Sequence, residues 1–262
     1  MTLFLHELKR DFVKLAVWSG AIAFMLLVSI VIYPQMTSQM SGIGDMFSEM
    51  GGFSAAFGMD KINFGTFEGY FAVECGNVLG LGGALFAALS GIAALSKEER
   101  ERTAEFLLTH PVSRAYVVGQ KLAALFAEVL VLNTVVALFA LVATLAIGES
   151  VDASLFCDLF AGYFLMQTEI ACVTFGASAF ICKGGLGIGI GAAFVLYFLN
   201  ILANLTEGAE FLRYVTPFSF ADGTAILSSG HIEGKYLLTG ALFTVLGVAA
   251  AFIEYGRKDV RS

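Results

Sequence analysis

Long apolar runs alternate with short polar segments along the whole chain. Each run is long enough to cross a bilayer as a helix, which takes about 20 residues. The runs predict spans over residues 15–33, 67–95, 115–147, 155–181, 186–205 and 236–255. We therefore predict an all-α polytopic membrane protein with six membrane-spanning helices, organised as one transmembrane domain over residues 1–262.

Residues 1–14, ahead of the first run, mix charged and apolar side chains at helical spacing. This pattern predicts an amphipathic helix at the membrane interface, with Lys9, Arg10 and Lys14 available to lipid headgroups. We expect the first span to end at Pro34, because a proline does not continue a helix well.

Basic residues gather on one side of the predicted spans. Of the 15 Lys and Arg residues, all but Lys61, Arg213 and Lys235 lie in segments on that side. Because loops rich in Lys and Arg stay in the cytoplasm, both termini are predicted to be cytoplasmic.

Composition agrees with a membrane protein and argues against several other classes. The chain is 58% hydrophobic and only 14% charged, which is outside the range of soluble proteins. No G-x-x-x-x-G-K-[ST] loop occurs, and neither the scattered histidines nor Ser113 and Ser219 have the neighbours that catalysis or metal binding requires. We expect no enzymatic activity, no metal and no nucleic-acid partner. The four cysteines show no C-x-x-C spacing and are expected to be structural thiols: Cys75, Cys157, Cys172 and Cys182.

Residues 96–114 interrupt the apolar pattern with the sequence SKEERERTAEFLLTHPVSR, which contains six consecutive charges. Ser96 and Glu99 have the spacing of a capping box, and Pro111 marks a stop, so we predict a helix over about residues 97–110. The second half of this helix is apolar. We interpret the stretch as a docking element, against the simpler alternative of an interfacial helix that only marks the membrane boundary.

A few polar side chains fall inside the apolar runs, where an ionised group costs about 2.5 to 3.5 kcal/mol on insertion scales. They are Glu74, Asn77, Glu128, Asn133, Gln167 and Glu169. They fit either a polar or proton-linked pathway or hydrogen bonds between helices, and Glu169 is the most deeply placed. Glycines in the second and fifth spans, including Gly76 and Gly80, predict close helix packing or a self-association face rather than a dinucleotide site.

Residues 98–121 resemble the cytoplasmic segment of type 2 ABC exporter permeases, the ABC-2 family. That segment has an acidic run, a Thr, a Phe-Leu-Leu group, a Pro-x-Ser-Arg group and a downstream Lys. The matching positions here are Glu98, Glu99, Glu101, Thr103, Phe106, Leu107, Leu108, Pro111, Ser113, Arg114 and Lys121. One position departs from the pattern, because Arg102 stands where the family often has Gly. The amphipathic N-terminus, the six spans and the proline-containing segment before the last span are also similar to this family.

The resemblance implies a permease subunit of an ATP-driven exporter in the plasma membrane of a prokaryote. Such permeases form homo- or heterodimers and pair with two separate ATPase subunits, which bind the ATP and Mg²⁺, so no cofactor is expected in this chain. The helix after the second span would be the coupling helix that docks on the ATPase. Its contact residues would be Glu98, Glu99, Glu101, Arg102, Thr103, Glu105, Phe106, Leu107, Leu108, Pro111 and Arg114. Nothing in the sequence selects the cargo.

A second hypothesis is a proton- or ion-coupled secondary transporter that uses intramembrane carboxylates. Its candidate groups are Glu74, Glu128 and Glu169. Such transporters commonly show interrupted helices in paired halves, and no such internal repeat is visible in this sequence.

Overall fold

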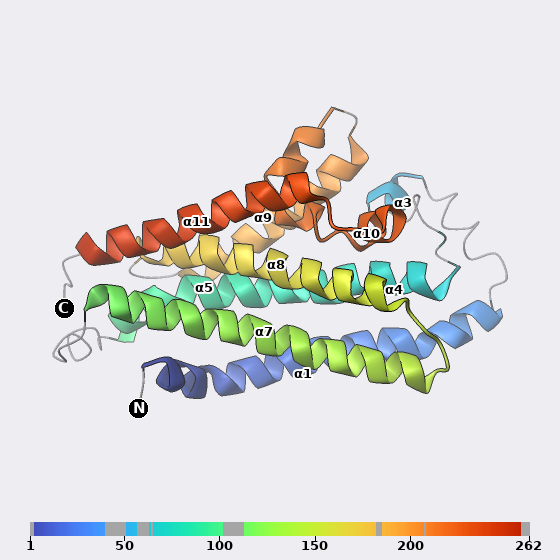
Figure 1. The fold of residues 1–262 in the computed structure, drawn as a ribbon, viewed down its shortest axis with the longest axis horizontal. Coiled ribbons are helices and arrows are strands. Elements are labelled where there is room, and N and C mark those ends of the chain that lie inside the picture. Colours follow the sequence, from blue (N-terminus) through green and yellow to red (C-terminus); the bar gives the residue numbers. More distant parts are fainter. Residues whose placement is uncertain are drawn as a thin grey trace.

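The computed structural model describes most of the chain, and every element in the described part is helical (Figure 1). It covers residues 3–39, 51–56, 63, 65–101, 113–181, 185–206 and 208–257, and the segments between these ranges lie outside the described structure. The elements are α1 Leu3–Gln39, α3 Gly52–Ala56, α4 Phe67–Cys75, the π-helix η2 Gly76–Gly80, α5 Leu81–Glu101, α7 Arg114–Ala146, α8 Ala153–Ser178, α9 Gly185–Leu205, the 3-10 helices η3 Glu210–Tyr214 and η4 Pro217–Ser219, α10 Gly223–Ser229 and α11 Gly234–Arg257.

Within the described residues, 6 helical stretches are long and apolar enough to cross a membrane. They are Leu3–Thr37, Phe67–Lys97, Arg114–Ala146, Ala153–Ser178, Gly185–Leu205 and Gly234–Arg257. The prediction of an all-α polytopic membrane protein with six spans is therefore confirmed.

The bundle is organised around α8, which packs between α5 and α11 (Figure 1). α1 packs mainly on α7, and α9 packs mainly on α5. In the most apolar window of α8, 61% of the residues are buried, against 17% in both α9 and α11. α8 therefore belongs to the core, whereas α9 and α11 leave most of their apolar surface uncovered by this chain.

The two ends of the bundle carry different parts of the chain. We call the end where α1 begins, α5 ends, α7 begins and α11 ends the proximal end; both chain termini lie there (Figure 1). We call the opposite end, which carries α3, α10 and the connection between α7 and α8, the distal end. An even number of spans places both termini on one side.

α1 corrects the prediction for the N-terminus, because residues 3–39 form one helix rather than an interfacial helix followed by a span. Part of the polar face of its first turns has partners inside the bundle, because Glu7 is buried and Lys14 is ion-paired. Lys9 is exposed, and its predicted availability to headgroups stays a prediction. Pro34 lies inside the helix and does not end it. A single proline removes only one helical hydrogen bond, and here it falls close to the helix's end. Whether the first turns lie at the membrane surface stays a prediction.

The second span also differs from the prediction at its proximal end. Ser96 does not cap a new helix, because it lies inside α5 and its Oγ donates to the Ile92 carbonyl at 2.8 Å. Nothing in the sequence ends α5 before this point, so the hydroxyl bonds back one turn, as serines inside helices do. α5 continues to Glu101, and the rest of the predicted docking helix lies within residues 102–112, which are outside the described structure.

One wide turn, η2, joins α4 to α5 within the second span. The sequence analysis did not anticipate it. Gln167 of α8 lies against this turn, and its Nε2 donates to the Leu79 carbonyl at 3.4 Å. Single π-helical turns inside α-helices often occur at functional sites.

Helix α8 approaches both of its neighbours through glycine. A Cβ added to Gly91 of α5 would lie 2.4 Å from the Ala171 carbonyl oxygen of α8, and one added to Gly176 of α8 would lie 2.4 Å from the Gly247 oxygen of α11. These distances are too short for any side chain, so both interfaces depend on bare backbone.

The glycines of the second and fifth spans, which the sequence analysis had singled out, differ in how closely other groups approach them. An added Cβ at Gly83 would clash with the Gln167 amide of α8, whereas others take less demanding positions. Added Cβ atoms at Gly76 and Gly80 would meet Tyr163 of α8 at 3.5 Å, which is ordinary contact. Gly187 and Gly191 of α9 have nothing within 4 Å. The predicted self-association face is not tested by these contacts and stays a prediction.

Candidate functional site

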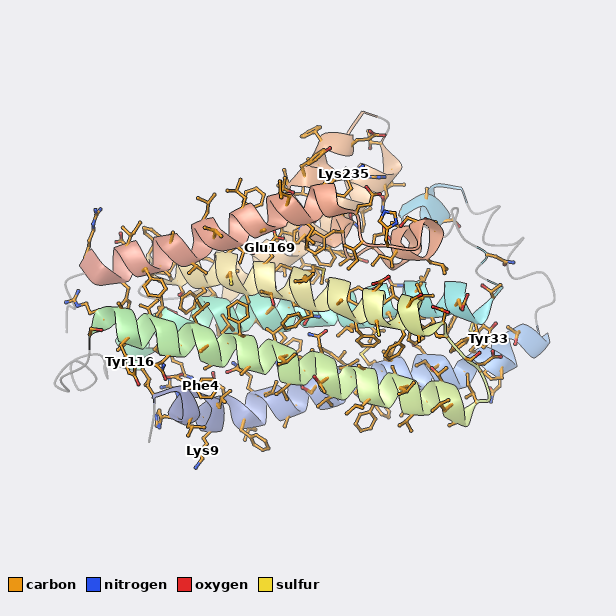
Figure 2. The ribbon with its side chains drawn as sticks, viewed as in Figure 1. Phe4, Lys9, Tyr33, Tyr116, Glu169 and Lys235 are labelled. Carbon is orange, nitrogen blue, oxygen red and sulfur yellow. The ribbon has the colours of Figure 1, made fainter. Side chains whose placement is uncertain are left out.

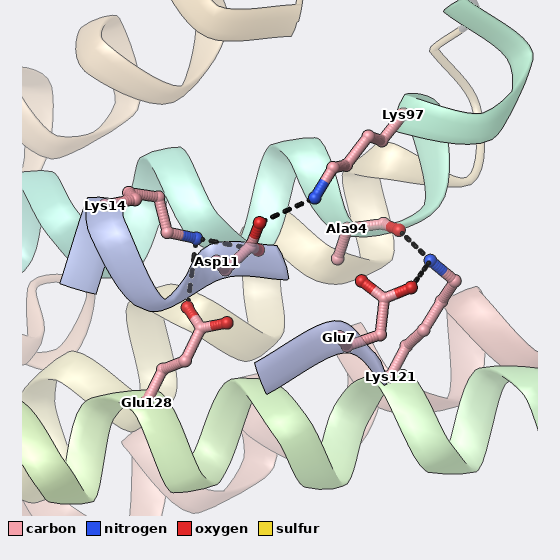
Figure 3. A network of polar contacts seen from close by, with 7 residues as sticks. All are labelled: Glu7, Asp11, Lys14, Ala94, Lys97, Lys121 and Glu128. Carbon is pink, nitrogen blue, oxygen red and sulfur yellow. Dashed lines mark hydrogen bonds and ion pairs between the residues drawn. The ribbon is translucent and has the colours of Figure 1, made fainter. Parts of the chain in front are cut away.

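Six charged side chains meet at the proximal end of the bundle. They come from three helices and form a network of carboxylates and ammonium groups (Figure 3). The members are Glu7, Asp11 and Lys14 of α1, Lys97 of α5, and Lys121 and Glu128 of α7. On α1 the three positions are spaced by four and three residues, which places them on one helical face.

Asp11 and Lys14 form the first half of this network. Asp11 lies between two lysines, with its Oδ1 2.7 Å from the Lys97 Nζ and its Oδ2 3.0 Å from the Lys14 Nζ (Figure 3). Lys14 also forms an ion pair with the Glu128 Oε2 at 3.0 Å. α1 is thereby held to both α5 and α7.

Glu7 and Lys121 form the second, more deeply buried half. The Lys121 Nζ lies 3.2 Å from the Glu7 Oε1 and donates to the Ala94 carbonyl of α5 at 2.9 Å. The Lys121 side chain is 1% exposed and that of Glu7 is 8% exposed. A buried ammonium group is stable only when it is paired and hydrogen-bonded, so this pair fixes how α1, α5 and α7 meet.

The network is balanced in charge and encloses little space. Three carboxylates face three ammonium groups, so the cluster adds no net charge to a bundle that crosses a membrane. All of these residues except Lys14 line a cavity of about 20 Å³. Ser90 also lines it, and the buried Ser90 Oγ has no hydrogen-bond partner in the described structure. That volume is enough for about one water molecule.

The start of α7 is fixed to the end of α11. Arg114 donates through its Nη1 to the carbonyls of Tyr255 at 3.4 Å and Gly256 at 3.3 Å. A cation is favourable at a helix C-terminus, where the last carbonyls lack helical partners. Ser113 caps α7, because its Oγ accepts from the Tyr116 N–H at 3.2 Å.

The predicted docking residues are only partly described. Glu98, Glu99 and Glu101 lie in the last turns of α5, and Arg114 is the first residue of α7. The others lie outside the described residues: Arg102, Thr103, Glu105, Phe106, Leu107, Leu108 and Pro111. Their docking role stays a prediction.

The sequence analysis missed the ion-pair network itself. Glu7 and Asp11 received no role, Lys14 was assigned to headgroups, and Lys97 and Lys121 entered only as parts of a charged stretch and a motif. The available signal was the helical spacing of two carboxylates and a lysine on α1. A polar face this regular, in a chain so poor in charge, indicates partners within the protein.

The predicted intramembrane polar residues fall into several separate places. Asn133 of α7 donates through Nδ2 to the Gln167 Oε1 of α8 at 2.7 Å and to the Val129 carbonyl at 2.9 Å. Gln167 in turn donates to the Leu79 carbonyl of η2, in the second span. These two amides therefore link three spans by hydrogen bonds.

The other four candidates do not join them. Glu128 belongs to the ion-pair network, and Glu74 lies beside Ser29 of α1. Glu169 lies between α8 and α11 (Figure 2), where an added Cβ at Gly240 would be 2.2 Å from its Oε2. That oxygen has no hydrogen-bond partner in the described structure. Asn77 lines a cavity at the distal end.

Cysteines and possible metal ligands are dispersed. Cys75, Cys157 and Cys172 are unpaired, and Cys182 lies outside the described residues. Within the described part of the chain, His, Cys, Asp and Glu form no group of three that could hold a metal ion.

One of two comparisons with known proteins found a match. The comparison with curated proteins found no match. The family described as ABC-2 family transporter protein matches residues 1–260, which is nearly the whole chain. The members of this family are membrane transport subunits, and they associate with ABC ATPases. The chain belongs to the ABC-2 family of transporter proteins, as the permease of an ABC transporter.

Proposed function

We propose that this chain is the membrane-spanning subunit of an ATP-driven exporter and that residues 96–114 dock on a separate ATPase subunit. In this proposal two copies of the permease, or this chain and a related one, assemble with two ATPases, which bind the ATP and Mg²⁺. The proximal end faces the cytoplasm of a prokaryotic cell. The arrangement of basic residues supports this orientation, because most of them lie in the segments at the proximal end.

The observation that carries the proposal is how the described residues on both sides of residues 102–112 are anchored. On the α5 side, Lys97 pairs with Asp11 of α1 at 2.7 Å. On the α7 side, Arg114 donates to the last carbonyls of α11. A displacement of the docking segment therefore acts on the first and last spans as well as on the two helices that it joins.

Such an arrangement suits a switch between two states. Helices that are packed and ion-paired move as rigid bodies, so closure of the ATPases could tilt several spans together. Cargo would then meet an opening on one side or on the other, and a polar pathway through this single chain is not required.

The apolar part of the docking segment provides the test. We expect the double change Phe106→Ala with Leu107→Ala to leave the yield and the melting temperature of the protein unchanged. It should abolish both co-purification with the ATPase and ATP-dependent export, because apolar anchors dominate the energy of docking surfaces.

A matched control removes the same two side-chain types elsewhere. Leu138 and Phe139 of α7 are 57% and 49% exposed, so Leu138→Ala with Phe139→Ala should not change ATPase binding. ATPase binding and export that survive the Phe106 and Leu107 changes contradict the docking proposal. Export driven by an ion gradient, in vesicles that contain this chain alone, contradicts the whole function and favours the secondary transporter.

A further inference from the structure

A second polar site lies at the distal end of the bundle, away from the ion-pair network. It is a cavity of about 50 Å³ between the second span, α8, α9 and the segment that carries α10. That is room for a few water molecules or a small polar group. Its polar lining consists of Asn77, Tyr163, Tyr197, Asn200, Asn204, Asp222 and Thr224.

Tyr163 of α8 contributes a hydroxyl to this cavity that makes no hydrogen bond within the described structure. The residue is 1% exposed, and its hydroxyl has no hydrogen-bond partner in the described structure. Glycines stand on two sides of the hydroxyl, so that added Cβ atoms would lie 3.5 Å away at Gly76 and 3.0 Å away at Gly223. A buried hydroxyl without a hydrogen-bond partner is unfavourable, so the site favours an occupant that bonds to it.

Two asparagine amides face the same space. Asn77 belongs to the π-helical turn η2 and Asn200 to α9, and both line the cavity. Neither side chain has a hydrogen bond to the rest of the described chain. Asn204 is engaged, since its Oδ1 accepts from the Arg213 Nη2 at 3.4 Å. An amide offers two donors and a carbonyl acceptor, so the free pair can bond groups that both donate and accept.

The charges around the cavity narrow the class of ligand. Asp222 is the one carboxylate in the described lining, and its Oδ1 accepts from the N–H groups of Thr224 and Ala225 at the start of α10. No lysine or arginine is among the described lining residues. An anionic ligand would meet a negative charge without a cation in the wall, so an uncharged ligand fits better.

We propose that this cavity binds an uncharged group that both donates and accepts hydrogen bonds, an amide or a hydroxyl, through Tyr163, Asn77 and Asn200. In an exporter, that group would belong to the cargo at its exit. The assignment to cargo rests on the proposed function, whereas binding to the cavity does not.

The first test measures access with the full chain in lipid nanodiscs, where both faces are reachable and no ATPase is needed. In Asn77→Cys and Asn200→Cys variants, a small charged thiol reagent should label the new cysteine at least tenfold faster than Cys75. Cys75 is fully buried two residues before Asn77, so it serves as an internal control in the same protein. Site-resolved mass spectrometry reads both rates.

The second test identifies the ligand chemistry with three probes at equal concentration: N-acetylalaninamide, glycerol and sodium acetate. The amide or the polyol should slow labelling at least threefold in an Ile201→Cys variant, which places the thiol in the cavity lining and keeps Tyr163, Asn77 and Asn200, and acetate should not slow it. Which of the two neutral probes protects better separates a peptide-like from a sugar-like group. Tyr163→Phe removes only the hydroxyl and should abolish the protection.

A third measurement avoids cysteine variants. The protecting probe should raise the melting temperature of the unmodified chain but not that of Tyr163→Phe. The proposal is overturned if neither new cysteine is labelled, if neither neutral probe protects, or if acetate protects equally well. None of these outcomes bears on ATPase docking, so the failure of this proposal is distinguishable from the failure of the exporter function.

Discussion

The two ends of the bundle are held together by different forces. At the proximal end, three carboxylates and three lysines join α1, α5 and α7 across the helix interfaces. At the distal end, no ion pair joins two spans within the described residues. The contacts there are amides, a phenol, the helix caps that Asp152 and Asp222 form, and the packing of Gly223 on the Ala72 backbone. The attraction of an ion pair falls slowly with distance, whereas close packing fails within a few tenths of an ångström. The ion-paired contacts of α1 with α5 and α7 can therefore persist through small shifts of these helices, whereas the contact of α10 with α4 is tied to one geometry.

The largest effect that this comparison predicts is at the buried lysine. Lys121→Met removes the ammonium group and leaves Glu7 as an uncompensated buried charge. We expect a loss of about 3 to 5 kcal/mol of stability, the usual cost of breaking a buried pair from one side. Unfolding in detergent, followed by circular dichroism, measures it.

The control for Lys121→Met is a double variant in which both partners of the ion pair are apolar. Glu7→Leu combined with Lys121→Met removes both charges and should recover most of the lost stability, because two well-packed apolar groups need no partner. A double variant as unstable as the single one would show that shape, rather than charge, holds the proximal end.

A smaller effect is expected at the distal end, where α10 rests on α4. An added Cβ at Gly223 would lie 2.4 Å from the Ala72 carbonyl oxygen, so Gly223→Ala must push α10 outward. Overpacking of this kind costs about 1 to 3 kcal/mol. Gly234 has nothing within 4 Å of an added Cβ, so Gly234→Ala is the matched control and should change the melting temperature little. Equal effects of the two changes would remove the argument for strict distal packing.

The smallest effect concerns the cap of α8 at the distal end. The pKa of the Asp152 carboxyl lies below its usual range, because the Ser154 hydroxyl and the N–H groups of Leu155 and Ser154 donate to it. A lowered pKa means that the folded state favours the ionised form. This contribution is present above the ordinary pKa and is lost as the pH falls through the lower, folded value.

Asp152→Asn separates the cap from its charge. The amide oxygen still caps the helix, so the stability of the variant near neutral pH should stay close to that of the parent protein, whereas its decline in acid should be shallower. Melting curves between pH 3 and pH 7, a range spanning the usual Asp pKa of about 3.9, measure both. If the melting temperature of Asp152→Asn falls in acid as steeply as that of the parent protein, other carboxylates determine this decline.

The spans were predictable from the sequence because each depends on local hydrophobicity. Helices α7, α8, α9 and α11 begin and end within a few residues of the predicted bounds. The continuation of α1 was not predictable in the same way. Its polar face has partners far along the chain: Asp11 and Lys97 are 86 positions apart, and Glu7 and Lys121 are 114 positions apart.

The candidate sites also combine features that depend on local sequence with features that depend on distant partners. Residue type and depth were enough to single out Asn77, Asn133 and Gln167, but the amide pair and the distal cavity exist only once helices far apart in the sequence are packed together. The π-helical turn was missed because five residues, Gly76 to Gly80, are too few to show a change of helical period.

That turn makes the second span act as two helices on one axis. In an α-helix each residue turns the chain by about 100°, so a single wide turn rotates the faces of α4 relative to those of α5 by a comparable amount. α4 can then face α10 and the distal cavity, while α5 faces α8 and α9. In a helix with one uninterrupted period, the same face would continue along the whole span and could not turn toward both sets of partners. The turn lets the same span belong to the core and to the distal site at once.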